Sequence, residues 1–168
     1  MENKPQTGRS GQRNSSMWFM NKVANPLVGL ILRSRLHALM SASMLIITYR
    51  GRKTGREYSL PVQYAQDGNH IFIVPGMPEQ KTWWRNLKGG LPIQLRLRGK
   101  SLNGKGSVLD PKIDPETIFE GLSVYLRRFP ALVQNQHIQV ESDGSFNPEE
   151  LRLAAKKTVI ICVELSQE

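Results

Sequence analysis

The pattern of apolar and polar positions predicts strands joined by short turns. In residues 44–49 the pattern is apolar and partly β-branched, in residues 70–74 it is apolar on both faces, and in residues 93–98 it alternates. Six segments in all are predicted as strands. They cover residues 44–49, 57–65, 70–74, 93–98, 100–109 and 158–165. Asp67-Gly68 is a strong hairpin signal, and Gly99-Lys100 is the predicted turn between the fourth and fifth strands, with Asn103-Gly104 as the competing turn. Connections this short favour antiparallel neighbours.

Four further segments have helical periodicity or helix-start signals. They cover residues 25–40, 82–88, 114–128 and 147–157, and residues 131–146 fit no element clearly. Asn25-Pro26, Asp114-Pro115 and Asn147-Pro148 each place a capping residue before a proline, which suits the first turn of a helix. About six mainly antiparallel strands with three or four helices predict an α+β fold around a small barrel.

Length and charge limit the domain organisation and the partners. The chain has 168 residues, a net charge of +9 and a pI of about 10.0. We expect residues 1–16 to be a disordered basic tail and residues 17–168 to be one domain that includes the amphipathic helix 25–40. The charge favours anionic partners: nucleic acid, acidic lipid or a polyanionic small molecule.

Cysteine usage and hydropathy bear on the compartment. Cys162 is the one cysteine, so no disulfide can form within the chain. No apolar segment reaches the ~18 residues of a membrane span, and the first sixteen residues are too polar for a signal peptide. These features predict a cytoplasmic protein. Helix 25–40 could pack on the barrel. Alternatively, it could rest on the inner face of a membrane, helped by Trp18, Phe19, Arg33 and Arg35.

The segment between the first two strands is a basic turn. Residues 50–56 read Arg-Gly-Arg-Lys-Thr-Gly-Arg, with the glycines framing a tight connection. Such a turn places cations and backbone N–H groups at one rim of a sheet, which is a receptor for an anion such as a phosphate. The alternative is a solvated hairpin tip.

Several common catalytic patterns are missing from the sequence. The three histidines are far apart, and no Cys/His cluster has metal-ligand spacing. The chain has neither a Gly-x-Ser-x-Gly elbow nor a Walker loop, and no carboxylate pair can be singled out. We therefore predict no metal site and assign no catalytic residue. If the protein is an enzyme, a cofactor carries the chemistry.

A combination of motifs resembles the deazaflavin (coenzyme F-420)-dependent nitroreductase and quinone reductase family. It consists of Gly51-Arg52-Lys53-Thr54-Gly55, Pro61, Asp67-Gly68 and Trp83-x-x-Asn86-Leu87. The resemblance covers residues 44–109 and the last strand. It implies a split β-barrel and binding of a reduced deazaflavin, whose tail carries a phosphodiester and several glutamates. That tail suits a strongly basic chain.

The resemblance also implies roles for single residues. The phosphate and tail would be held by Arg52, Lys53, Thr54, Gly55 and Arg56. The ring and linker would be lined by Thr48, Pro61, Val74, Pro75 and Gly76. The pocket would be closed by Trp83, Trp84 and Asn86, with one tryptophan in the core. Lys81 stands where relatives often have proline; it would add a cation, or the loop would simply differ there. The candidate substrate contacts are Gln63, which shares a strand face with Pro61, and Trp18 and Phe129. The late tyrosines of some relatives are absent from residues 129–136, so the resemblance leaves the acceptor open.

The predicted activity is hydride transfer to a quinone, a nitro compound or another conjugated acceptor. Solvent, Tyr58 or Tyr64 could supply the proton. The alternatives are an FMN-binding reductase of the same fold, and a flavin- or deazaflavin-binding or membrane-surface protein without turnover. Nucleic acid is disfavoured because no strand interleaves basic residues with exposed aromatic ones. The oligomeric state stays open.

Overall fold

The computed structural model describes residues 42–136 and 138–166. The tail 1–16, Trp18 and the predicted helix 25–40 lie outside the described residues. The described strands are β1 (Met44–Arg50), β2 (Glu57–Gln63), β3 (Ala65–Asp67), β4 (His70–Ile73), β5 (Leu91–Leu97), β6 (Lys100–Val108) and β7 (Ile161–Leu165). The helices are the 3₁₀ helix η2 (Trp83–Leu87), α4 (Pro115–Arg128), α5 (Ala131–Asn135) and α6 (Pro148–Lys157).

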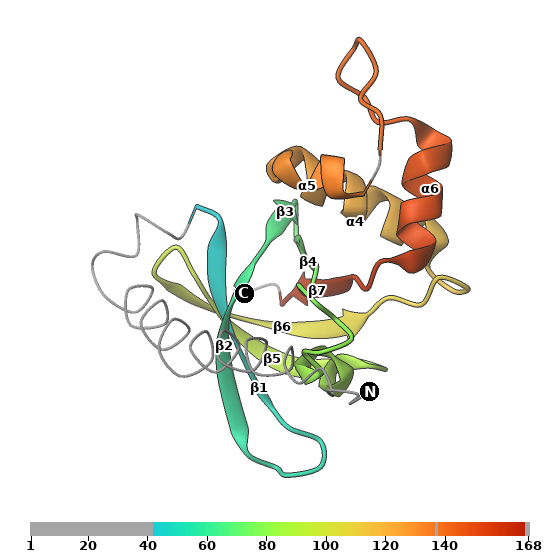
Figure 1. Ribbon diagram of the computed structural model, residues 1–168. Helices are drawn as coiled ribbons and strands as arrows, with labels where there is room; N and C mark the ends of the chain where they lie inside the picture. The colour runs from blue at the N-terminus through green and yellow to red at the C-terminus, as the bar shows by residue number, and fades with distance from the viewer. Residues whose placement is uncertain (1–41, 137, 167–168) are drawn as a thin grey trace, which may run out of the picture.

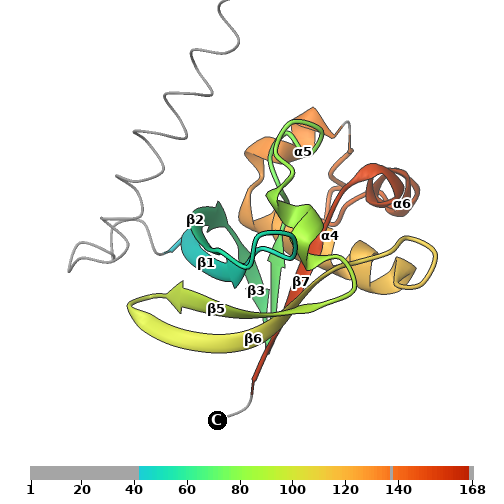
Figure 2. The same cartoon turned by 90° about the horizontal axis from the view of Figure 1, so that it is seen from below.

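All seven strands belong to one antiparallel sheet that curls on itself. Its order is β2-β1-β5-β6-β7-β4-β3, so β2 and β3 form the two edges. Only Tyr64 separates these two strands along the chain. Because one residue cannot span a flat seven-stranded sheet, the edges must approach each other, and the long strands β5 and β6 curve across the molecule (Figures 1 and 2). The result is the half-open barrel of the predicted α+β class.

The strand count corrects the sequence prediction in one place. Residues 57–65 were predicted as one strand, but the structure breaks them at Tyr64. Val62 pairs with Leu45 of β1, whereas Ala65 pairs with Phe72 of β4 at the other edge of the sheet. Pairing with two distant partners therefore divides a continuous strand-like segment, and the described residues form seven strands. The competing turn at Asn103-Gly104 is wrong, because both residues lie inside β6.

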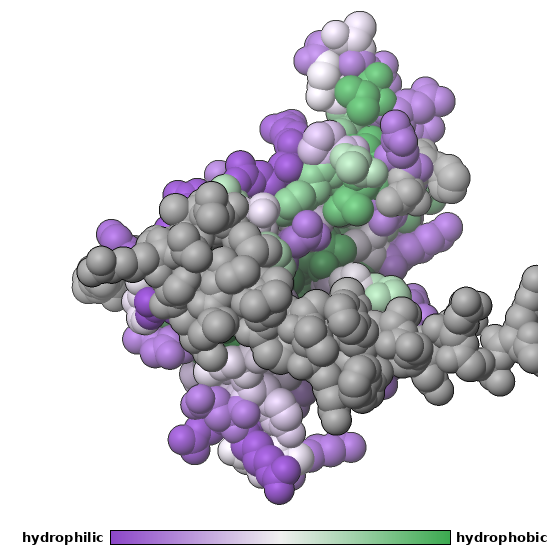
Figure 3. Space-filling view, turned by 60° about the vertical axis from the view of Figure 1, so that its left-hand side comes forward, coloured by the Kyte–Doolittle hydropathy of each residue, from purple (hydrophilic) through white to green (hydrophobic). Residues whose placement is uncertain are grey.

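Two apolar cores hold the fold together. The interior of the barrel is filled by alternating side chains of its strands and by η2, among them Leu45, Ile47, Ile71, Leu87 and Leu95. A second core lies between β4 and β7 on one side and helices α4 and α6 on the other. Figure 1 shows these helices gathered at one end of the sheet, and Figure 3 shows apolar residues exposed toward that end between polar ones.

Helix α4 is packed very closely on the sheet. A Cβ at Gly121 would lie 2.5 Å from the ring of Phe72, so only glycine permits this approach.

The capping residues predicted to start α4 and α6 make different hydrogen bonds. Asn147 caps α6 by accepting bonds from the backbone N–H groups of Glu149 and Glu150, whereas Asp114 makes no side-chain cap and accepts from Asp110 N instead.

Candidate cofactor groove

A groove runs along β2 and the segment that follows β4. Its volume is about 640 Å³, within the usual range of small-molecule sites. It is lined by seven residues expected near the cofactor or substrate: Pro61, Gln63, Val74, Pro75, Gly76, Lys81 and Trp83. A turn closed by the bond from Lys81 N to Met77 O, 2.9 Å, holds Lys81 at its rim. The structure thus brings residues from three separate segments to one concave surface.

Three aromatic side chains form one wall of this groove, which we call the aromatic wall: Tyr49, Tyr58 and Trp83. The Tyr49 and Tyr58 rings stack with centroids 5.7 Å apart, and Tyr49 and Trp83 are 6.4 Å apart. Burial, with a smaller effect from Tyr58, raises the pKa of Tyr49, so its phenol stays protonated near neutral pH. Aromatic rings along a groove favour stacking with a flat conjugated ligand.

The basic turn is well ordered by its own hydrogen bonds. Gly51 N donates to Arg56 O and Gly55 N donates to Gly51 O, both at 2.8 Å, and Gly55 takes the left-handed φ of 65°. Thr54 and Tyr58 are joined through their hydroxyls at 3.2 Å. A Cβ at Gly51 would lie 2.7 Å from the Tyr58 ring. The turn is therefore packed directly against the end of the aromatic wall.

A set of hydrogen bonds, which we call the brace, ties the turn to η2. Arg52 N donates to Asn86 Oδ1 at 3.1 Å, and the Arg52 guanidinium donates to Gly90 O at 3.0 Å. The other end of the Asn86 amide donates to Trp83 O at 2.9 Å. The Asn86 side chain thus joins the basic turn to Trp83, which lines the groove. Arg52 and Asn86 act in this structure as positioning residues.

The remaining basic residues of the turn have no such partners. Lys53 and Arg56 are exposed, and among the described residues neither forms an ion pair. Neighbouring cations that have no carboxylate partner repel one another. Together they create a positive potential that attracts anions. The charge that suits an anionic tail is concentrated where the groove begins, at Tyr58 and Ser59.

Other predicted site residues lie away from the groove. Trp84 is a core residue whose indole N–H donates to Pro78 O at 3.0 Å. Thr48 shares a 2.7 Å hydroxyl contact with Ser59 but does not itself line the groove. Phe129 packs on Tyr125, with ring centroids 4.8 Å apart, and Tyr64 lies in the barrel core. Trp18 lies outside the described residues.

The sequence analysis missed several groove residues. Tyr49, Ser59, Gln80 and Thr82 line the groove but were not proposed as site residues. Tyr49 lies in an apolar strand segment, where an aromatic residue is usually core. The available signal was its position, because it directly precedes the basic turn at the end of β1.

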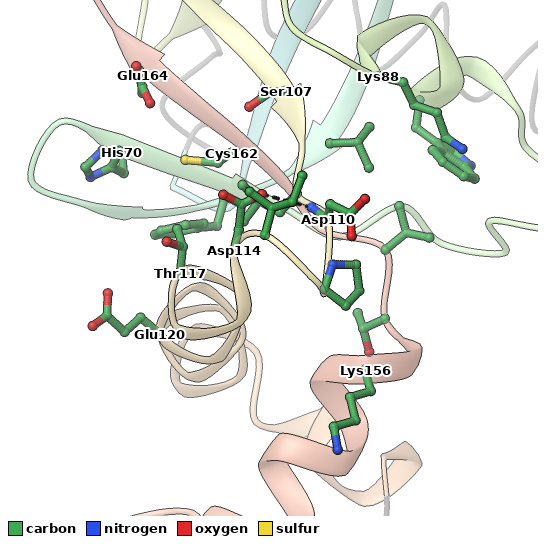
Figure 4. Close-up of a pocket in the computed structure, with 18 of the residues that line it drawn as sticks. His70, Lys88, Ser107, Asp110, Asp114, Thr117, Glu120, Lys156, Cys162 and Glu164 are labelled. Carbon is green, nitrogen blue, oxygen red and sulfur yellow. Dashed lines mark hydrogen bonds between the residues drawn. The ribbon is translucent and has the colours of Figure 1, made fainter.

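A larger cavity lies elsewhere on the molecule and has the wrong charge for a polyanion. It measures about 860 Å³ and faces β4, β6, β7 and α4. Five carboxylates line it, from Asp67, Asp110, Asp114, Glu120 and Glu164. Figure 4 shows most of these around Cys162, with Lys88 and Lys156 at the edges. By contrast, Lys81 is the one charged residue among those that line the groove, so the groove is the better site for an anionic cofactor.

The described residues provide neither a metal-binding cluster nor a membrane-spanning helix. No group of three or more His, Cys, Asp or Glu side chains is arranged to hold a metal ion there. No helix in that part of the chain has the length and apolar character needed to cross a bilayer.

The site has the two parts that a deazaflavin coenzyme requires. One end offers unpaired cations and backbone N–H groups for a phosphorylated, acidic tail, and the other offers an aromatic wall and apolar strand residues for a flat ring. The donors present therefore fit that coenzyme. Fold and site together define a split β-barrel protein of the flavin- and deazaflavin-binding class.

Comparison with family models identifies the chain more closely. The model of the "F420H(2)-dependent quinone reductase" family matches residues 34–117, half of the chain. The chain belongs to this family, and the protein is an oxidoreductase that uses reduced coenzyme F-420. The matched region contains the basic turn, β2, the segment after β4 and the brace.

Solved structures with the same fold give independent support for the barrel. One described as "Structure of F420-H2 Dependent Reductase (FDR-A)" has 14% identity and a TM-score of 0.51, covering 73% of this chain and 94% of its own. Another, described as a "domain-swapped dimer", has 12% identity and a TM-score of 0.53, covering 89% and 99%. At these identities the likeness supports the fold alone. No curated protein sequence matches the chain.

Proposed function

We propose that the groove holds reduced coenzyme F-420 and that the protein reduces a quinone or a similar conjugated acceptor. The observation that carries the proposal is the continuity of the basic turn with a groove that no carboxylate among the described residues lines. Lys53, Thr54 and Arg56 would hold the tail, and Pro61, Val74, Pro75, Gly76 and Trp83 would hold the ring. When bound, the coenzyme supplies a hydride, which with one proton converts a quinone to a hydroquinone.

The protein's own residues bind and orient rather than exchange electrons. The brace fixes the turn relative to Trp83, so the tail and ring sites keep a constant separation. Tyr58 is 40% exposed and its hydroxyl contacts Thr54, so solvent reaches this end of the groove. Water can therefore deliver the proton, and no side chain is assigned as the catalytic acid.

The test is a titration of the purified protein with reduced coenzyme F-420, followed by absorbance under anaerobic conditions. We expect saturable binding that weakens as salt rises, because the tail contacts are exposed charges. A parallel titration with FMN, which carries fewer negative charges, should be weaker and less dependent on salt. Tight FMN binding together with no detectable F-420 binding would refute the proposal.

The acceptor is tested separately, by turnover with a quinone series and a nitroaromatic series at saturating coenzyme. If the protein reduces neither class, the proposed activity is contradicted.

Contact of residues 25–40 with a membrane stays a prediction, and sedimentation with vesicles that contain anionic lipid tests it. Absence of binding to such vesicles would remove that prediction without affecting the reductase proposal.

A further inference from the structure

A second, smaller cavity adjoins the cofactor groove. It measures about 380 Å³ and shares four residues with the groove: Gln63, Val74, Pro75 and Gly76. These residues are a common boundary, with the groove on one side and helices α4 and α5 on the other. A ligand in this cavity would therefore lie next to a ligand in the groove. We call it the helix-side cavity.

The wall contributed by the helices is mainly apolar. Leu122 and Leu126 of α4 are fully buried, and Leu132 of α5 is half-buried against the second core. Apolar side chains from two helices suit a compact apolar ring system, whose transfer from water stabilises the complex. The acidic tail of a coenzyme would gain little here, because Lys157 is offset by Glu79 at the rim.

Tyr125 is the exception in this apolar wall. Its side chain is 2% exposed, yet no hydrogen bond joins its hydroxyl to another described residue. It belongs to neither core cluster and lines the helix-side cavity instead. Among the described residues, the fully buried side-chain polar atom without a hydrogen-bond partner is Arg96 Nε and not the Tyr125 hydroxyl. Tyr125 is instead the one phenol that lines this cavity, where its hydroxyl can bond a polar ligand. Burial also raises the pKa of Tyr125 to about 12, so the phenol keeps its proton and can donate.

We propose that the helix-side cavity is the acceptor subsite and that the Tyr125 hydroxyl donates a hydrogen bond to an oxygen of a planar conjugated carbonyl compound. This inference rests on the proposed function, since it places the acceptor beside the cofactor groove. Gln63, at the common boundary, can offer its amide to the same ligand. The class of acceptor is therefore compact, aromatic and oxygen-bearing, as small quinones are.

The experiment measures binding without turnover. Protein saturated with oxidised coenzyme F-420, which cannot reduce an acceptor, is titrated by calorimetry with 1,4-naphthoquinone and with naphthalene, which lacks the oxygens. Tyr125→Phe should weaken naphthoquinone binding about two- to tenfold, the effect of one neutral hydrogen bond, and leave naphthalene binding unchanged. A purely structural role of Tyr125 would weaken both ligands equally, and that outcome would overturn the assignment.

A second variant tests the cavity independently of the hydroxyl. Leu132→Phe should fill part of the space and weaken both ligands about tenfold or more. Leu153→Phe is the matched control, because Leu153 is 57% exposed on α6 and lines neither cavity. Naphthoquinone binding that is unchanged in both Tyr125→Phe and Leu132→Phe would place the acceptor elsewhere.

Binding of the coenzyme is measured separately from binding of the acceptor. Binding of oxidised coenzyme should be the same in wild type, Tyr125→Phe and Leu132→Phe, because none of these changes touches the basic turn. Failure of the wild-type protein to bind the coenzyme would refute the proposed function, not the cavity assignment. The same two titrations with coenzyme-free protein would then decide whether the cavity binds a conjugated carbonyl compound.

Discussion

Arg52 and Lys53 are adjacent cations in the basic turn, and the structure predicts different consequences of removing each. The Arg52 guanidinium is engaged with Gly90 O at 3.0 Å, and its backbone N–H with Asn86 at 3.1 Å. Lys53 is exposed and has no hydrogen-bond or ion-pair partner among the described residues. Arg52→Ala should therefore affect both stability and cofactor affinity, whereas Lys53→Ala should affect affinity alone.

The expected magnitudes follow from the contacts. A contact of Lys53 with an anionic tail is worth between ~1 kcal/mol, as for an exposed ion pair, and ~3 kcal/mol, as for a charged hydrogen bond. At 1.4 kcal/mol per tenfold, Lys53→Ala should raise the Kd for reduced coenzyme by about 5- to 140-fold. Loss of the Arg52–Gly90 bond should cost about 1 kcal/mol of stability, which corresponds to a Tm lower by roughly 2–4 °C.

The assay combines thermal unfolding with coenzyme titration at two salt concentrations. Lys100→Ala is the matched control, because this exposed lysine starts β6 at the opposite end of the sheet from the turn. Saturating coenzyme should restore turnover in Lys53→Ala, since a tail contact is equally strong in the ground and transition states. Wild-type affinity in Lys53→Ala would refute the anion-binding role of the turn. An unchanged Tm in Arg52→Ala would refute a stabilising role of the guanidinium–Gly90 bond, since the backbone bond to Asn86 is retained in this variant.

Three further predictions concern other parts of the molecule. Gln63→Ala should change the preference among acceptors more than the Kd for the coenzyme, because Gln63 lies between the two cavities. An equal loss of turnover with every acceptor, together with weaker coenzyme binding in titrations, would contradict this. Gly121→Ala should destabilise the protein by about 1–3 kcal/mol in urea unfolding, because its Cβ would meet Phe72, and a smaller effect would mean that α4 can shift. Burial, and then Glu164 and Asp114, raise the pKa of Cys162 from 9.0 to about 11, so the folded state holds this proton more tightly and stability falls as pH rises from 9 to 11. Unfolding measured across that range should show a shallower fall in Cys162→Ala, and identical slopes would exclude this source of alkaline instability.

Much of the fold could be predicted because its determinants are local. The strand β1 is a continuous apolar run, β5 alternates, and Asn147-Pro148 starts α6 as its capping chemistry requires. The break at Tyr64 could not be predicted in this way. Residues 57–65 have one uninterrupted strand pattern, and only pairing with β1 on one side and β4 on the other divides it.

The site was predictable to the extent that each residue acts through its own chemistry. A glycine-framed basic turn attracts anions wherever it lies, and Val74-Pro75-Gly76 ends a strand in any context. The roles of Arg52 and Asn86 depend instead on bonds between residues 34 and 38 positions apart. Tyr125 has the periodicity of an ordinary core residue of α4, and its place in the wall of the helix-side cavity becomes visible only in the structure.

The same break at Tyr64 explains why the two cavities share a boundary. Gln63 is the last residue of β2, and after Tyr64 the chain enters the hairpin of β3 and β4, which returns to Val74. Because β4 also pairs with β7 and packs under α4, its end is fixed by both cores. Val74, Pro75 and Gly76 therefore leave the sheet beside Gln63, with the basic turn and aromatic wall on one side and the helices on the other. A slip of one residue in the pairing of β2 would turn Gln63 to the opposite face. The closure of the barrel thus sets both the groove and the helix-side cavity that adjoins it.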